Sequence, residues 1–180
     1  MSGGRVLGAL IAGGAASRFG SDKALAPWRG RAMIGWAADA LAPWCDAVVV
    51  VGREWDGLAS ITDRPAPGLG PLGGIAGALV HAGAHGFGTV VTIGCDMPDV
   101  PRELIGRLLA AAPAYCADVP ILGAWPAALA PALIGRLSAA VPGAKDGRLS
   151  IRRWATEIGA TPVLAPAPLA NVNTPADLVA

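Results

Sequence analysis

VLGALIAGGAASRFGSDK, residues 6–23, joins a short apolar run to two adjacent glycines and then to two basic residues, Arg18 and Lys23. An apolar run that ends in Gly13-Gly14 predicts a central strand followed by a turn at which only hydrogen atoms project. Backbone N–H groups can then approach an anion closely. Because a guanidinium fork and a mobile ammonium group hold phosphate oxygens in complementary ways, the stretch predicts a phosphate-binding loop.

The glycine spacing differs from two common phosphate-binding motifs. A Walker loop requires G-x-x-x-x-G-K-[ST], but five residues separate Gly14 from Gly20, and Ser21 stands where the lysine belongs. G-x-G-x-x-G is also missing at the end of the apolar run, which disfavours a dinucleotide-binding Rossmann site. A glycine-rich turn with two solvated cations is the simpler alternative.

Length, charge and cysteine content narrow the class of protein. We expect one domain, residues 1–180, because a chain of this length can bury a sizeable core. The formal net charge of +1 favours neither nucleic acid nor a membrane surface as a partner, and no apolar stretch is long enough to span a bilayer. Three cysteines without a C-x-x-C pair favour a reducing compartment, with the cytoplasm as the default location.

Three apolar runs set the expected fold. Each of the runs Arg5–Ile11, Ala47–Val51 and Thr89–Gly94 precedes a glycine-bearing turn and helix-compatible sequence. Such alternation predicts an α/β sandwich whose mostly parallel central sheet is covered on both faces.

Weaker patterns predict the remaining elements. We expect a helix over Met33–Leu41 and an extended loop over Ile61–Gly77, with Pro71 able to start a helix. Further expected elements are a short strand at 60–62, a helix from Pro101 to Ala112, two strand pieces within 114–126, helices at 132–140 and 148–158, and a strand at 161–164.

Two carboxylates follow predicted strands. Asp96 stands directly beyond Thr89–Gly94, and Asp63 follows the short strand at 60–62. The carboxyl ends of parallel strands line the crevice where open α/β sheets bind ligands, so both side chains are candidate site residues. Capping or turn formation is the alternative role for each.

Four pieces together resemble the molybdenum cofactor guanylyltransferases, and the match spans nearly the whole chain. In order, they are Ile11-Ala12-Gly13-Gly14 through Lys23, Gly70-Pro71-Leu72 with Gly74-Ile75, Cys95-Asp96-Met97-Pro98, and Asn171-Val172-Asn173-Thr174-Pro175. The resemblance implies a Rossmann-like nucleotidyltransferase fold with three layers. It also implies a cytoplasmic enzyme whose partners are two small-molecule substrates and, in addition, molybdoenzyme maturation proteins.

The implied reaction is attack by the terminal phosphate of molybdopterin on the α-phosphorus of GTP, with pyrophosphate leaving. The resemblance assigns Arg18 and Lys23 to the leaving pyrophosphate, and Asp96 to catalysis and to Mg²⁺, the implied cofactor. Asn171 and Asn173 are assigned to the molybdopterin side. The implied GTP-binding residues are Ile11, Ala12, Gly13, Gly14, Lys23, Asp63 and Asp96.

The same resemblance suggests guanine preference, and it has two departures. The guanylyltransferases share the double glycine, whereas related cytidylyltransferases usually carry LAAG, in which a methyl group can close a space beside a base. Where relatives often have Asn after the second strand, this chain has Val51-Gly52-Arg53, so a base or ribose contact there must come from backbone or from Arg53. Trp125-Pro126 replaces a common His-Pro pair, which weakens the assignment of the pterin side.

Three other interpretations remain open. A cytidylyltransferase or sugar-phosphate nucleotidyltransferase would share the N-terminal signature, and an accessory protein would bind nucleotide or cofactor without catalysis.

His81 and His85 have metal-ligand spacing, but glycines cluster around them and no Glu lies between, which favours a surface pair at a helix end.

Lys23→Ala should lower turnover by roughly 10²–10³, the scale for losing one preorganised group that stabilises charge, and should leave the fold intact. Steady-state kinetics and thermal unfolding on one preparation check this. A parallel loss of stability and activity would make Lys23 a structural residue, and unchanged activity would remove it from the mechanism.

Overall fold

The fold is built around a seven-stranded sheet. In the computed structural model of the chain, the described residues are 4–13, 23–140 and 147–169. The strands, in the order in which they lie side by side, are β5 (Ala59–Ile61), β4 (Ala47–Val51), β1 (Val6–Ile11), β6 (Thr89–Gly94), β8 (Gly123–Pro126), β7 (Ala114–Cys116) and β9 (Thr161–Val163). β8 runs antiparallel to both neighbours and the other pairings are parallel, which confirms the mostly parallel sheet.

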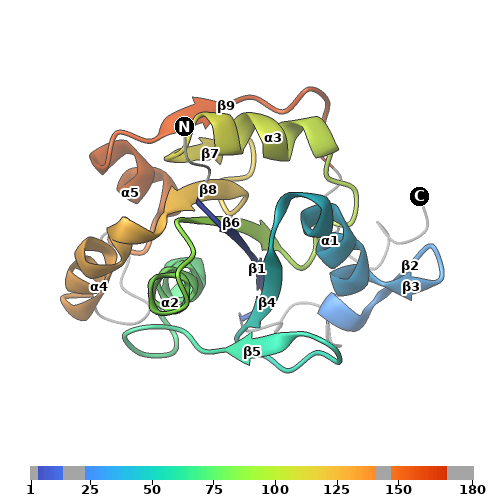
Figure 1. The fold of residues 1–180 in the computed structure, drawn as a ribbon, viewed down its shortest axis with the longest axis horizontal. Coiled ribbons are helices and arrows are strands. Elements are labelled where there is room, and N and C mark those ends of the chain that lie inside the picture. The colour runs from blue at the N-terminus through green and yellow to red at the C-terminus, as the bar shows by residue number, and fades with distance from the viewer. Residues whose placement is uncertain (1–3, 14–22, 141–146, 170–180) are drawn as a thin grey trace.

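Helices cover both faces of the sheet, as Figure 1 shows. Leu72, Leu133 and Trp154 of α2, α4 and α5 are buried in the core on one face, and Ile34 and Leu104 of α1 and α3 in the core on the other. The helices are α1 (Met33–Leu41), α2 (Gly70–Ala84), α3 (Arg102–Ala110), α4 (Ala130–Ser138) and α5 (Ile151–Glu157). This arrangement confirms the three-layer sandwich.

Shorter elements complete the description. β2 (Pro27–Trp28) and β3 (Arg31–Ala32) form a separate hairpin before α1. The 3-10 helices are η1 (Lys23–Leu25), η2 (Ala42–Trp44) and η3 (Ala127–Leu129). Among the described residues, no helix is long and apolar enough to cross a membrane.

Most predicted elements are confirmed. β4, β6 and α1 have the bounds expected from the sequence, and the two strand pieces within 114–126 are β7 and β8. β1 starts one residue after the expected position, whereas β5 lies one residue earlier, at Ala59–Ile61. The prediction for α4 was wrong by two residues, because Pro131 lies within its first turn and does not delay its start.

The expected loop over Ile61–Gly77 is wrong in its second half, since α2 begins at Gly70. Its glycines are sites of close packing: a Cβ at Gly74 would lie 3.2 Å from a methyl carbon of Ile11 in β1. A Cβ at Gly77 would lie 2.2 Å from the carbonyl oxygen of Thr62. The glycines therefore allow the helix to lie against the ends of β1 and β5, and this packing outweighs their low helix propensity.

Gly77→Ala should destabilise the protein by about 1–3 kcal/mol, because the new methyl group must displace the Thr62–Asp63 segment from α2. Gly83→Ala is the matched control in the same helix. No atom lies within 4 Å of a Cβ at Gly83, so alanine should stabilise there by about 0.5–1 kcal/mol. Urea unfolding of both variants measures the difference. Equal free energies of unfolding would contradict the assigned contact.

Candidate active site at the carboxyl ends of the strands

Four parallel strands end in one row. Ile11 of β1 pairs with Val51 of β4 and with Gly94 of β6, and Val51 pairs with Ile61 of β5. Backbone hydrogen bonds continue past the row, from Ala12 N to Val51 O at 3.1 Å, from Gly52 N to Ile61 O at 2.9 Å, and from Cys95 N to Ile11 O at 3.3 Å. The segments that follow these strands are therefore held beside one another, where ligands bind in open α/β sheets.

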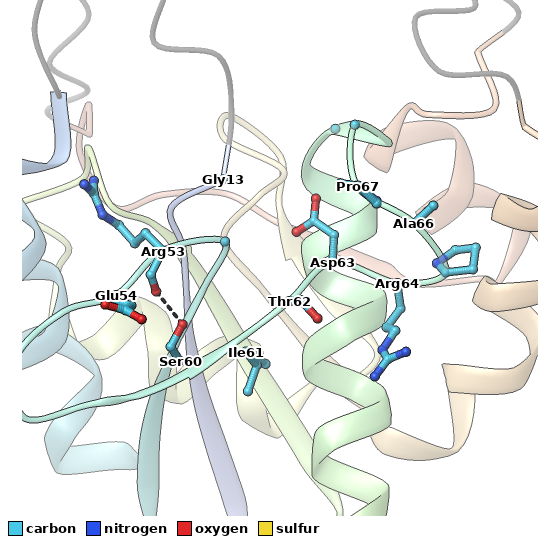
Figure 2. A pocket seen from close by; sticks show the side chains of 14 residues that line it. Gly13, Arg53, Glu54, Ser60, Ile61, Thr62, Asp63, Arg64, Ala66 and Pro67 are labelled. Carbon is cyan, nitrogen blue, oxygen red and sulfur yellow. Dashed lines mark hydrogen bonds between the residues drawn. The ribbon is translucent and has the colours of Figure 1, made fainter.

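A pocket of about 810 Å³ opens above the ends of β4 and β5. This volume falls within the usual range for small-molecule sites. The lining comes from the end of β1, from the turn after β4 and from the segment between β5 and α2: Gly13, Gly52, Arg53, Glu54, Ser60–Gly68 and Gly70. The Ser60 hydroxyl donates to the Arg53 carbonyl oxygen at 2.7 Å, which closes the turn at one side of the pocket (Figure 2).

Asp63 is one of two acidic residues that line this pocket, with Glu54. Figure 2 shows its carboxylate between the backbone at Gly13 and the start of α2, while Arg64 points in the opposite direction. A Cβ at Gly13 would lie 3.6 Å from Asp63 Oδ1, and one at Gly73 would lie 3.3 Å from Oδ2. Two glycines therefore flank the carboxylate and leave its oxygens accessible between them.

The Asp63 carboxylate is partly removed from water. Partial burial raises its pKa above the ordinary value of 3.8. Within the described part of the chain, no hydrogen bond or ion pair satisfies its side chain. A ligand that donates hydrogen bonds to both oxygens would relieve this cost.

Asp96 lies at the other end of the row. It follows β6 directly and is half-buried, and its Oδ1 would be 2.5 Å from a Cβ at Gly94, so the carboxylate lies against the end of that strand. β5 and β6 are three strand positions apart, which separates the two acidic positions by about 14 Å at a spacing of ~4.8 Å per strand. A single compact ligand group therefore cannot contact both carboxylates at once.

Asp96 suits a hard cation that takes its remaining ligands from substrate and water. Among the described residues, no three His, Cys, Asp or Glu side chains gather closely enough to hold a metal ion by themselves. Mg²⁺ needs only one or two carboxylates when substrate phosphates and water complete its shell, whereas structural zinc needs several protein ligands. The residues at the end of β6 therefore fit Mg²⁺ bound together with a phosphorylated substrate.

Comparison with known proteins identifies the family. The model of the MobA-like NTP transferase domain matches residues 8–161. A molybdenum cofactor guanylyltransferase from Rhodobacter capsulatus is 35% identical, over 97% of this chain and 93% of the relative. The chain belongs to the MobA-like nucleotidyltransferase family.

Solved structures agree with the fold of this family. A nucleotidyl transferase from Methanothermobacter superposes with a TM-score of 0.69 at 18% identity, covering 97% of this chain and 94% of that one. The molybdopterin-guanine dinucleotide biosynthesis protein A of Archaeoglobus fulgidus gives 0.65 at 22% identity, with 96% and 95% covered. These likenesses confirm the nucleotidyltransferase fold predicted from the sequence.

The family motifs converge on the row of strand ends as far as the structure describes them. Ile11, Ala12 and Gly13 lie at the end of β1, and Ile11 is 4% exposed, so it offers backbone more than side chain. Lys23 begins η1. Gly14, Arg18, Asn171 and Asn173 are outside the described residues, so their predicted roles stay predictions.

Sequence reasoning missed part of the pocket wall. It singled out Asp63, Gly13 and Arg53, but it did not assign Glu54, Ser60 or the segment Arg64–Gly68 to a site. The density of proline and glycine after Asp63 indicates a long loop, and such a loop in a compact domain is usually a binding element or mobile. What it could not indicate was that this element faces Gly52 and Gly13, because that depends on the strand order.

Other candidates lie away from the site. His81 and His85 stack with ring centroids 4.0 Å apart at the end of α2, which fits the predicted surface pair. Trp125 is fully buried at the amino end of β6 and donates from Nε1 to Thr92 Oγ1 at 3.0 Å. Trp125-Pro126 is therefore a core element in this family member and contributes no contact at the carboxyl edge.

Asp63→Asn should change the pH dependence of stability in a defined direction. Because the folded pKa is raised above the unfolded value, Asp63 stabilises the fold below the unfolded pKa, and this contribution is lost as pH rises through the folded pKa. Near neutral pH the asparagine variant should therefore unfold at higher urea concentration than wild type. The gap should close as the pH falls toward the unfolded pKa. Urea unfolding across this range checks the prediction, and a gap that widens in acid would contradict it.

Proposed function

We propose that this protein transfers GMP from GTP to molybdopterin, releasing pyrophosphate and forming molybdopterin guanine dinucleotide. The observation that carries the proposal is the pairing of Gly13 with the accessible carboxylate of Asp63 inside the pocket. Membership of the family and the name of the Rhodobacter capsulatus relative support the same reaction. We further propose that residues 1–180 form a single domain that works in the cytoplasm.

The base of GTP is proposed to bind at Asp63. Guanine presents two adjacent donors, N1–H and the N2 amino group, and a carboxylate presents two acceptor oxygens. Cytosine presents only one donor group, its amino group, beside ring and carbonyl acceptors. The pocket at Asp63 therefore favours guanine, provided that nothing covers the carboxylate oxygens on the side of Gly13.

The phosphates are proposed to extend from the pocket along the row of strand ends toward Asp96. Gly13 and Gly14 supply backbone N–H groups near the phosphates, and Lys23 and Arg18 stabilise the leaving pyrophosphate. An oxygen of the molybdopterin phosphate forms the new bond to the α-phosphorus while the bond from that phosphorus to the pyrophosphate oxygen breaks. The chain contributes alignment and neutralisation of charge.

Mg²⁺ is the proposed cofactor, with Asp96 as its protein ligand. The ion would supply neutralisation of negative charge on the phosphates. The length of the row supports separate duties for the two carboxylates, with Asp63 at the base and Asp96 at the phosphates. Asn171 and Asn173 are proposed to orient molybdopterin, and proteins that mature molybdoenzymes are the proposed recipients of the product.

Pyrophosphate release tests the function directly. The protein is supplied with molybdopterin and Mg²⁺, and with GTP, CTP or UTP in turn. GTP should support release far better than the other two. Preference for CTP would identify a cytidylyltransferase instead, and tight GTP binding without release would identify a nucleotide-binding accessory protein.

Gly13→Ala should lower kcat/KM for GTP at least ~10-fold, about 1.4 kcal/mol, and should affect CTP less. The added methyl group would lie 3.6 Å and 4.0 Å from the two carboxylate oxygens of Asp63, which are ordinary contact distances, so the fold tolerates it while the oxygens become covered. Gly135→Ala in α4, where no atom lies within 4 Å of a Cβ, is the control. An unchanged ratio of GTP to CTP would contradict the assigned base site.

Asp96→Asn should lower the affinity for Mg²⁺ and remove most activity even at saturating GTP. The change keeps the volume and removes the negative charge that a hard cation requires. Asp99→Asn is the matched control, because Asp99 is a nearby exposed carboxylate that lies 3.9 Å from Arg29. Titration of both variants with Mg²⁺ measures the effect. Wild-type activity of Asp96→Asn at the same metal concentration would assign the ion to another group.

A further inference from the structure

Gly52 is in direct backbone contact with the loop after β1. A Cβ at this position would lie 2.7 Å from the Cα of Gly13 and 3.0 Å from its nitrogen, which leaves no room for any side chain. The backbone of Gly52 cannot retreat, because its N–H donates to the carbonyl oxygen of Ile61 at 2.9 Å. Gly52 is therefore fixed to β5 on one side and pressed against Gly13 on the other.

The contact sets where Gly13 lies relative to Asp63. A Cβ at Gly13 would lie 3.6 Å from the Cα of Gly52 and equally 3.6 Å from Asp63 Oδ1, so Gly13 occupies the space between them. Asp63 is in turn backed by Gly73 of α2, at 3.3 Å from a Cβ there. The four residues form a continuous line of contacts across the floor of the pocket, and three of them are glycines.

We propose that Gly52 is a positioning residue for nucleotide binding, whose missing side chain lets Gly13 lie against it and so keeps open the space beside the Asp63 carboxylate that the base enters. Gly52 itself need make no hydrogen bond to the ligand. A side chain at this position would push Gly13 along the line of contacts and narrow or tilt the space beside the carboxylate. This inference rests on the proposed function for the identity of the nucleotide, GTP, and for the placement of its base beside Asp63.

If backbone strain were the only effect of a substitution at Gly52, the variant would lose stability for a reason unrelated to the contact with Gly13. Gly52 has φ +84°, a left-handed conformation that disfavours every residue with a side chain, so any substitution costs stability even without a contact. Gly57 separates the two effects. It has φ +83° in the same connection between β4 and β5, no atom lies within 4 Å of a Cβ there, and it does not line the pocket.

The test compares Gly52→Ala with Gly57→Ala in the full-length chain. Thermal unfolding measures the strain, and calorimetric titration with GTP and Mg²⁺ measures binding without turnover. Both variants should lose a similar amount of thermal stability. Gly52→Ala should bind GTP at least ~10-fold more weakly than wild type, with a matching rise in KM and a smaller change in kcat, and Gly57→Ala should stay within about twofold.

Equal GTP affinities of the two variants would overturn the proposal. If alanine at position 52 prevents folding, Gly52→Asn and Gly57→Asn repeat the comparison with a residue that accepts left-handed backbone more readily. Titration with CTP distinguishes this inference from the proposed function. A wild-type protein that binds CTP in place of GTP refutes the guanylyltransferase assignment, and the role of Gly52 is then judged by the loss of CTP binding. A wild type that binds neither nucleotide overturns both.

Discussion

The in-register parallel pairing of β1 with β4 and β6 is the constraint on which the rest of the structure depends. Within β1, Leu7, Ala9 and Leu10 are fully buried, so a slip of one residue would exchange the side chains between the two helix-covered faces. Together with the pairing of β4 and β5, it brings four strand ends into one row. Because Gly13, Gly52, Asp63 and Asp96 all come shortly after that row, the register of a buried strand determines where these candidate residues lie.

Missing side chains shape the site as much as present ones. Gly13, Gly52, Gly73 and Gly77 lie where backbone meets backbone or where backbone meets the Asp63 segment. A Cβ at any of them would contact a neighbour that belongs to the pocket or supports it. Glycine loses more conformational entropy on folding than other residues, so these four positions lower the stability of the fold while they allow neighbouring segments to pack closely. The desolvated carboxylate of Asp63 adds a second local cost, which a hydrogen-bonding ligand would offset.

The sheet separates the two candidate acidic residues along its carboxyl edge. Asp63 belongs to a pocket lined partly by proline and glycine, which is the proposed site of the base. Asp96 stands three strand positions away and is half-buried like Asp63, and it is the proposed ligand of Mg²⁺ beside the phosphates. Because about 14 Å separates the two acidic positions, each can be altered by mutation with little direct effect on the other.

The amino-acid sequence by itself determined the α/β class, the bounds of β4, β6 and α1, and the motifs after β1 and β6, because apolar periodicity and glycine-bearing turns are local signals. It failed over Gly70–Gly77, where the glycines of α2 are explained by contacts with β1 and with Thr62. Only the tertiary structure places Asp63 beside Gly13 and Gly52 in backbone contact with Gly13. Fifty residues of chain separate Gly13 from Asp63, and their contact follows from the strand order, which no local pattern in the sequence encodes.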